Sequence, residues 1–428
     1  MVENQQNKIQ LLQFIKESFT YSFTKIIPGF LGFFSVIIFL RILGPEEYGL
    51  FSMLFLLVQI SSFFCFGWLR QALLRYYGRL VNTPTLEGII VSGLFIAIIV
   101  NVFILTLFKF FQFPLTFSLT PVVFLSLAMI FVSLADVLFM VQEKPKKVVQ
   151  LTTVQSILAI FFPVLLIMNF YPSHMNIITG LGLAYGLTAV IFLYMQLYQR
   201  KPVLKWTLLD KKLLQNLRPL FQFGWPLSFW YAASTTLRFL DRYFIEYFLD
   251  TATMGSYASF IELITRFFTV LLFPVTLALH PRMMNFWNEK KYSSAYRLLW
   301  SGIIIQFFLF IVVLFIYIFF KSQWLILLFK LLPDLDPAMT NIIIPAMLGG
   351  FIWQFALLIH KPLEVQEKSK LMLLFICLSV CINIIGNYIF IPRIGVIATA
   401  YTMIVSGSFY LFFSMLASSR FWTVRVAK

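Results

Sequence analysis

The sequence contains little charge. Only 12% of its 428 residues are Asp, Glu, Lys or Arg, whereas 60% are hydrophobic and the mean hydropathy is +0.89. A water-soluble domain averages about 25% charged residues, and no stretch of about 50 residues, a small domain, is polar enough here to fold in water. This shortage of charge excludes a soluble globular protein and predicts a chain that lies in lipid.

The alternation of apolar and polar residues that marks membrane β-strands is also missing, because the apolar runs are long and continuous. Helices satisfy their backbone hydrogen bonds inside hydrocarbon, and each span needs about 20 residues. We therefore predict an all-α polytopic membrane protein with about twelve transmembrane helices. The predicted spans are 19–43, 50–67, 88–108, 115–141, 148–170, 177–197, 225–249, 255–279, 298–320, 342–360, 371–391 and 396–417.

The spans form two sets of six. A basic linker, 200–218, separates an N-terminal bundle, 1–199, from a C-terminal bundle, 219–428. The segment LGPEEYGLFS at 43–52 resembles LDTATMGSYA at 249–258, which places Gly49 on Gly255. Repeated halves of like orientation are a recurrent transporter design in which the substrate site lies between the halves. We predict two pseudo-symmetric six-helix bundles.

Positive charge is distributed unevenly between the two sides of the predicted membrane. Twenty-four of the 33 Lys and Arg residues fall in the segments on the side of the termini, and five fall in the opposite loops. Positive residues are retained in the cytoplasm, so both termini are predicted to be cytoplasmic and the protein to lie in the cytoplasmic (inner) membrane. The net charge of +16 then reflects topology and contact with anionic membrane lipids, and we predict no nucleic acid partner.

Cysteine and histidine are scarce. The three cysteines lie within spans and have no disulfide or metal-ligand spacing, and the three histidines are isolated from one another in the sequence. The sequence therefore predicts no metal site, no cofactor and no catalytic set.

Ionisable residues within the spans are the functional candidates. A charge at the centre of a span costs about 2.5–3.5 kcal/mol to insert, so it faces protein or water and usually marks a pathway. These residues are Lys25, Asp136, Arg238, Asp241, Arg242, Glu246, Glu262 and Arg266. Four of them are acids and four are cations.

Helical spacing relates several of these residues. Arg238, Asp241, Arg242 and Glu246 are expected to share one helix face, with Arg242 a partner of Asp241 or Glu246. Arg238 would then be left as the free cation. It is predicted to line a polar cavity together with Arg266.

The remaining charges have simpler interpretations. Glu262 and Arg266 are four residues apart and are expected to pair. Lys25 either extends to the membrane surface or lines the site. Asp136 is expected to pair with Lys144 or Lys147 as a structural ion pair, although it and the acids Asp241 and Glu262 are also candidates for coupling transport to an ion.

Four segments resemble one known family. They are RILGPEEYGLF at 41–51, GWLRQALLRYYG at 67–78, DRYFIEYFLDTATMGSYA at 241–258 and NIIGNYIFIPRIGVIATAYT at 383–402. Their order and their places at the helix junctions resemble the polysaccharide transporters known as Wzx-type flippases. That family belongs to the superfamily of multidrug, oligosaccharidyl-lipid and polysaccharide exporters.

The resemblance implies a V-shaped cavity between two bundles and a protein that is not an enzyme. It implies that polyprenyl-diphosphate-linked oligosaccharides are moved across the membrane by alternating access for cell-surface polysaccharide biosynthesis, and that polysaccharide-assembly proteins are partners. Lys25, Arg238, Arg242 and Arg266 would hold the anionic headgroup.

Two other functions fit parts of the sequence. A cation-coupled multidrug exporter of the same superfamily would use acids in the cavity, and Glu262 or Asp136 would serve. A membrane polysaccharide polymerase or ligase would be expected to carry a large outer loop rich in Arg or His. The longest outer loop predicted here, 321–341, has two Lys and no His.

Overall fold

The computed structural model describes residues 2–80, 85–111, 117–199, 211–332 and 335–419, with side chains from residue 27 onward except at 85, 197–199 and 211–216. Every regular element in these ranges is a helix, so the predicted all-α fold is confirmed. The elements are α1 (Val2–Leu80), α2 (Thr85–Phe110), α3 (Leu119–Val141), α4 (Pro145–Asn169), α5 (His174–Gln199), α6 (Lys211–Phe239), α7 (Asp241–Phe248), α8 (Thr251–Asn288), α9 (Tyr292–Phe319), α10 (Lys321–Leu331), the 3₁₀ helix η1 (Pro337–Ile342), α11 (Ile343–Ile359), α12 (Lys361–Val365), α13 (Ser369–Ile394) and α14 (Ile397–Ala417).

The first two predicted spans both lie in α1, which turns at Gly44. This residue has φ 78° and ψ 171°, a conformation that favours glycine because a side chain would be strained there. Pro45 follows and begins the returning half of α1, a position that suits proline because the first helical N–H has no partner. The returning half continues to Leu80, well past the predicted end at 67.

Ten helices within the described ranges are long and apolar enough to cross a bilayer. The turn at Gly44 divides one of them, α1, into two spans. The predicted seventh span corresponds to α6 and α7. These two helices are not among the ten, because they contain more polar residues. The helices begin at Lys211, earlier than predicted, and are interrupted only at Leu240. The arrangement therefore provides the twelve predicted spans.

The second half of the sequence has its own turn at the place that the repeat predicts. α7 ends at Phe248, and Asp250, which the repeat places on Gly44, caps the start of α8 by accepting a 2.7 Å hydrogen bond from the amide of Thr253. That amide and the Thr253 hydroxyl lower the pKa of the Asp250 carboxyl. A glycine turn in one half and an aspartate cap in the other thus produce the same change of direction.

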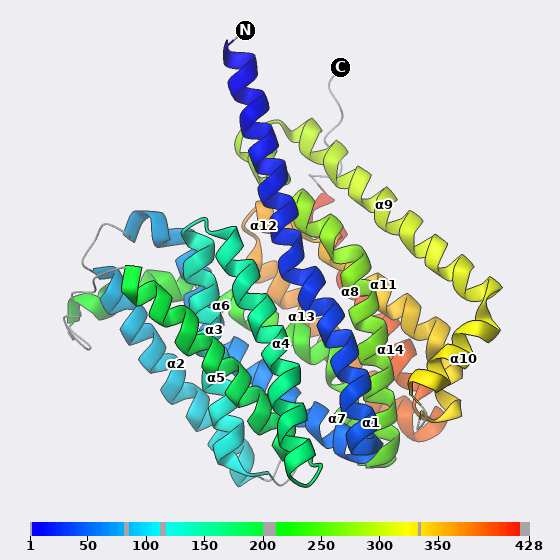
Figure 1. Cartoon of the computed structure of the whole chain (residues 1–428). Coiled ribbons are helices and arrows are strands. Elements are labelled where there is room, and N and C mark those ends of the chain that lie inside the picture. Colours follow the sequence, from blue (N-terminus) through cyan, green and yellow to red (C-terminus); the bar gives the residue numbers. More distant parts are fainter. Residues whose placement is uncertain (1, 81–84, 112–116, 200–210, 333–334, 420–428) are drawn as a thin grey trace.

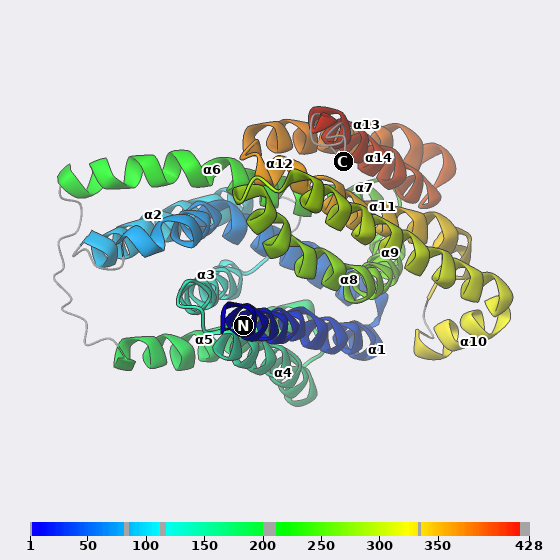
Figure 2. The ribbon, with the colours of Figure 1, turned by 90° about the horizontal axis from the view of Figure 1, so that it is seen from above.

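The returning half of α1 lies against α6, α7 and α8, which connects the two halves of the sequence (Figure 2). It approaches α8 closely at the two glycines that the repeat superimposes: a Cβ on Gly49 would lie 3.0 Å from the Cα of Gly255. A Cβ on Gly255 would overlap the carbonyl of Pro45. Both positions need glycine because the backbones themselves are in contact.

α1 begins and α14 ends on the same face of the molecule (Figure 1). On the opposite face, part of the predicted outer loop is helical, as α10 and η1. Arg41 lies there beside the Gly44 turn, and its Nε donates a 3.0 Å hydrogen bond to the carbonyl of Leu331 at the end of α10. Glu47 accepts a 2.6 Å hydrogen bond from the amide of His174 and thereby caps α5. Two charged residues of the segment at 41–51 therefore hold helix ends.

Candidate substrate cavity

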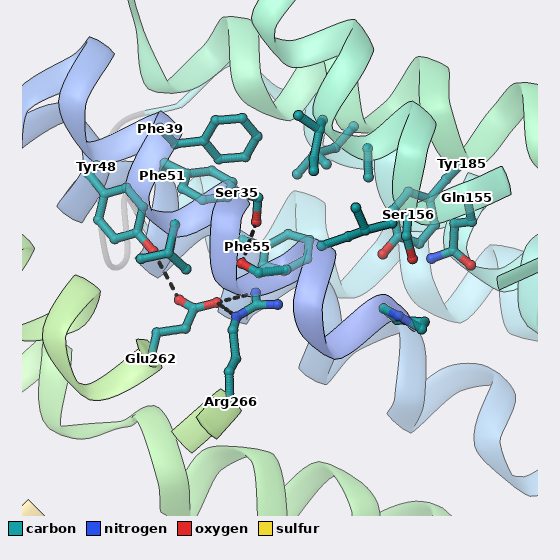
Figure 3. Close-up of a pocket in the computed structure, with 17 residues that line it drawn as sticks. Ser35, Phe39, Tyr48, Phe51, Phe55, Gln155, Ser156, Tyr185, Glu262 and Arg266 are labelled. Carbon is teal, nitrogen blue, oxygen red and sulfur yellow. Dashed lines mark hydrogen bonds and ion pairs between the residues drawn. The ribbon is translucent and has the colours of Figure 1, made fainter. Parts of the chain in front are cut away.

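A cavity of about 170 Å³ lies between α1, α4, α5 and α8. It is bounded by elements from both predicted halves, with α8 contributing the ion pair of Glu262 and Arg266 (Figure 3). Much of the wall is aromatic. The lining side chains and glycine are Pro28, Leu31, Gly32, Ser35, Val36, Phe39, Tyr48, Phe51, Phe55, Gln155, Ser156, Ala159, Ile160, Leu181, Tyr185, Glu262 and Arg266.

Glu262 is the centre of the charged wall. One carboxylate oxygen lies 2.5 Å from Nη2 of Arg266, which confirms the predicted pair. The other oxygen accepts a 3.2 Å hydrogen bond from the hydroxyl of Tyr48 and lies 3.6 Å from Nη2 of Arg242. A single carboxylate is therefore shared between two guanidinium groups, and the local charge is positive.

The guanidinium of Arg266 is exposed to the cavity. Its side chain is 29% exposed, whereas that of Arg242 is only 4% exposed. Nε and Nη2 of Arg266 both donate to Glu262, and in the described part of the chain Nη1 has no acceptor. This nitrogen rests on Gly32, where a Cβ would overlap it. The small residue on α1 thus leaves space for the guanidinium of Arg266, and Nη1 remains available to donate to a ligand.

Arg238 lies at the end of α6 and contacts aromatic rings instead of a carboxylate. Its Cζ is 5.0 Å from the ring centre of Phe239 and 5.6 Å from that of Trp353. The Cζ of Arg242 is 4.6 Å from the same Phe239 ring. Such cation–π contacts stabilise a guanidinium without neutralising it. In the described residues Arg238 has no ion pair and does not line the cavity.

Asp241 and Glu246, the two acids of α7, accept hydrogen bonds from other groups. Asp241, buried at the start of α7, accepts hydrogen bonds from the Tyr257 hydroxyl and from the backbone amide of Arg242. Glu246 accepts a 2.8 Å hydrogen bond from the hydroxyl of Thr251. The ion-pair partner of Arg242 is thus Glu262, and neither acid that the sequence analysis named for it.

Two further candidates are Asp136 and Lys25, of which Asp136 does not line the cavity. Asp136 on α3 forms a 2.8 Å ion pair with Arg70 of α1, where the sequence suggested Lys144 or Lys147. The pair joins two helices that are adjacent in space but 66 residues apart. Lys25 belongs to the helical backbone of α1, but its side chain lies outside the described residues.

The sequence analysis missed several residues of the cavity. Tyr48, Gln155, Ser156 and Tyr185 are uncharged and were not considered, although the polar run QLTTVQS at 150–156 is unusual within a span. That run was the available signal, because amide and hydroxyl side chains in a membrane helix usually face protein or water. The aromatic residues of the cavity wall could not be recognised in the sequence, because they do not differ from the other residues among its 52 phenylalanines.

A second polar cluster lies among the helices of the C-terminal half. Glu364 of α12 lies 2.7 Å from Nζ of Lys361, 3.0 Å from Nε2 of His360 and 3.4 Å from Nδ1 of His280. Tyr410 on α14 extends the cluster, since its oxygen is 2.9 Å from Nδ1 of His360. Two histidines separated by 80 positions thus meet at one carboxylate. In the described chain no group of His, Cys, Asp and Glu has the arrangement of a metal site.

The chain matches a known protein family. A family model described as "Polysaccharide biosynthesis protein" matches residues 14–287, more than half of the sequence. The chain belongs to the polysaccharide biosynthesis protein family. A second model, described as "MatE", matches residues 226–389 of this family member. No curated protein sequence matches it.

Solved structures share the fold of this polysaccharide biosynthesis family member. An outward-facing multidrug resistance MATE family transporter of the MOP superfamily is 13% identical, with a TM-score of 0.67 over 97% of this chain and 96% of the other. The MATE multidrug transporter DinF-BH is 14% identical, with a TM-score of 0.67 over 95% of each chain. The eukaryotic MATE transporter AtDTX14 is 13% identical, with a TM-score of 0.61 over 96% of each. The chain therefore has the MATE transporter fold.

Proposed function

We propose that the protein is a flippase that moves polyprenyl-diphosphate-linked oligosaccharides across the cytoplasmic membrane. The family match to polysaccharide biosynthesis supports this substrate class, and the fold supports transport by alternating access of one bundle against the other. Membrane lipids, and other proteins that assemble the polysaccharide, are its partners in this proposal.

The observation that carries the proposal is the sign of the charge at the cavity. Arg266 and Arg242 share the single carboxylate of Glu262, so one positive charge is not compensated. The spans as a whole do not have a cationic excess, but the other acids are held by partners outside the cavity wall, Asp136 by Arg70 and Asp241 by Tyr257. A diphosphate is the kind of headgroup that an exposed guanidinium binds best.

In this mechanism each residue has a distinct task. Arg266 donates from Nη1 to a phosphate oxygen, while Glu262 and Gly32 hold its guanidinium in place. Arg242 adds positive charge from a buried position. Arg238, four residues earlier at the end of α6, adds positive charge from a longer distance. Lys25 is a further cation on the same first helix as Gly32.

The second candidate is a multidrug exporter, which the MATE transporters of similar fold favour. An exporter of organic cations needs a carboxylate that is free to bind them. Among the described residues that line the cavity, Glu262 is the only acid, and two arginines occupy it. The charge at the cavity therefore favours the anionic substrate.

The test replaces Arg266 by Ala in cells whose only copy of the gene is the variant. We expect surface polysaccharide to fall at least tenfold and lipid-linked repeat units to accumulate, because the exposed donor to the headgroup is lost. Arg393→Ala, which removes an exposed arginine at the end of α13, is the matched control and should complement fully. Membrane levels of both variants are measured by immunoblotting.

The outcomes separate the two candidates. Full complementation by Arg266→Ala would overturn the role of this residue. Normal polysaccharide in a strain that lacks the gene, together with lost efflux of ethidium or rhodamine, would instead establish the exporter.

A further inference from the structure

The cavity has a second polar wall that the charged residues do not explain. Gln155 and Ser156 come from α4 and Tyr185 from α5, and Figure 3 shows Gln155 and Tyr185 close together, away from Glu262. These three side chains are neutral. The cavity thus has a cationic side on α8 and an uncharged hydrogen-bonding side on α4 and α5.

The donors and acceptors of this wall are open to a ligand. The hydroxyl of Ser156 donates a 2.7 Å hydrogen bond to the carbonyl of Thr152, which leaves its oxygen as an acceptor. Gln155 and Tyr185 lie close together in this wall. An amide offers two donors and an acceptor, so Gln155 can bind a ligand beyond Tyr185. Such a set matches sugar hydroxyl or acetamido groups.

The size of the cavity limits what fits there. Its volume is about 170 Å³. Drug-sized ligands occupy pockets of about 300–1,000 Å³. In this conformation the cavity has room for about one sugar ring beside Arg266, with aromatic side chains such as Phe55 around it.

We propose that Gln155, Ser156 and Tyr185 bind the first sugar of the substrate, the one next to the diphosphate, and determine which sugar is accepted. The proposal rests on the proposed function, since it assigns the diphosphate to Arg266. It makes the wall of α4 and α5 the specificity-determining side of the cavity. The remaining sugars of the oligosaccharide lie outside it.

The experiment measures the affinity of the detergent-purified full chain for three probes by native mass spectrometry. The probes are undecaprenyl diphosphate alone, the same lipid with one N-acetylglucosamine, and the same lipid with one galactose. We expect at least one sugar to raise the affinity of the wild type. Gln155→Leu and Tyr185→Phe should weaken binding of that probe about 3- to 10-fold, the effect of one lost hydrogen bond. Both should bind undecaprenyl diphosphate as the wild type does.

Two variants serve as controls. Gln323→Leu removes an exposed amide from α10 and should change nothing. Arg266→Ala should weaken binding of all three probes. If neither sugar raises the affinity of the wild type, or if Gln155→Leu and Tyr185→Phe weaken all three probes equally, the sugar site is overturned while the flippase proposal stands. If the wild type binds none of the probes, the proposed function itself is overturned.

Discussion

Single residues decide the chemistry of the cavity through contacts that join distant parts of the chain. Tyr48 donates to Glu262 across 214 positions, and Gly32 supports Arg266 across the same two helices. The i, i+4 pair of Glu262 and Arg266 was predictable, since helix geometry alone brings these side chains together. The second ion pair of Glu262, with Arg242, could not be predicted from the sequence, because it depends on how α7 packs beside α8.

Gly32 offers a test of Arg266 that leaves Arg266 itself unchanged. In Gly32→Ala the new methyl group occupies the place of Nη1, so the guanidinium must turn away from its position at the cavity. We expect polysaccharide export to fall severalfold with a normal amount of protein in the membrane. Complementation and immunoblotting check this result.

Gly78→Ala is the control for that substitution, since a Cβ at Gly78 meets no atom within 4 Å. It should complement fully. Wild-type export by Gly32→Ala would show that the position of the guanidinium does not matter.

At the level of elements, the helices themselves follow from apolar length, while their joints depend on particular residues. The turn at Gly44 and the cap at Asp250 lie at equivalent places of the repeat. Gly49 and Gly255, which the repeat superimposes, meet each other in the structure. The repeat predicted only that these glycines are equivalent, and the structure adds that they are in contact, as residues near a pseudo-symmetry axis are.

The contact at Gly255 predicts a loss of stability. A methyl group in Gly255→Ala would overlap the carbonyl of Pro45, and the backbone cannot yield without moving the Gly44 turn. We expect a cost of about 1–3 kcal/mol, typical of overpacking, and a lower Tm in thermal unfolding of the detergent-purified protein.

The comparison variant is Gly49→Ala, whose methyl group would lie 2.7 Å from the end of the flexible Met254 side chain and 3.0 Å from the Cα of Gly255. Its Tm should lie between those of the wild type and Gly255→Ala. An unchanged Tm for Gly255→Ala would contradict the close packing of α1 and α8.

The whole molecule has two faces, and each carries a contact between sequence-distant elements. Arg75 of α1 pairs with Glu367 at 2.7 Å on the face where α1 begins, and Arg41 binds the end of α10 on the other. The imbalance of Lys and Arg predicts that the first of these faces is cytoplasmic. The division into bundles at 1–199 and 219–428 stays a prediction, and residues 200–210 of its linker lie outside the described ones.

Cysteine labelling tests the predicted orientation. After Cys65, Cys377 and Cys381 are replaced by Ser, single cysteines are introduced at exposed positions of the two faces. Lys146→Cys and Glu289→Cys should be protected from a membrane-impermeant maleimide in intact cells and react after lysis. Tyr171→Cys and Ser322→Cys should react in intact cells, and the reverse pattern would mean that the termini are outside.

The sequence by itself determined the class of the protein, its twelve spans and the pairing of Glu262 with Arg266, because hydropathy, charge imbalance and helical spacing are local properties that a linear pattern contains. Only the tertiary structure decided which charges meet the cavity. It joined Asp136 to Arg70, left Arg238 against Trp353, gathered two histidines at Glu364 and placed the neutral wall of α4 and α5 in the cavity with Arg266. The physical reason is that an ion pair or cavity forms between helix faces, and the rotation and tilt that bring two faces together depend on the packing of all neighbouring helices at once.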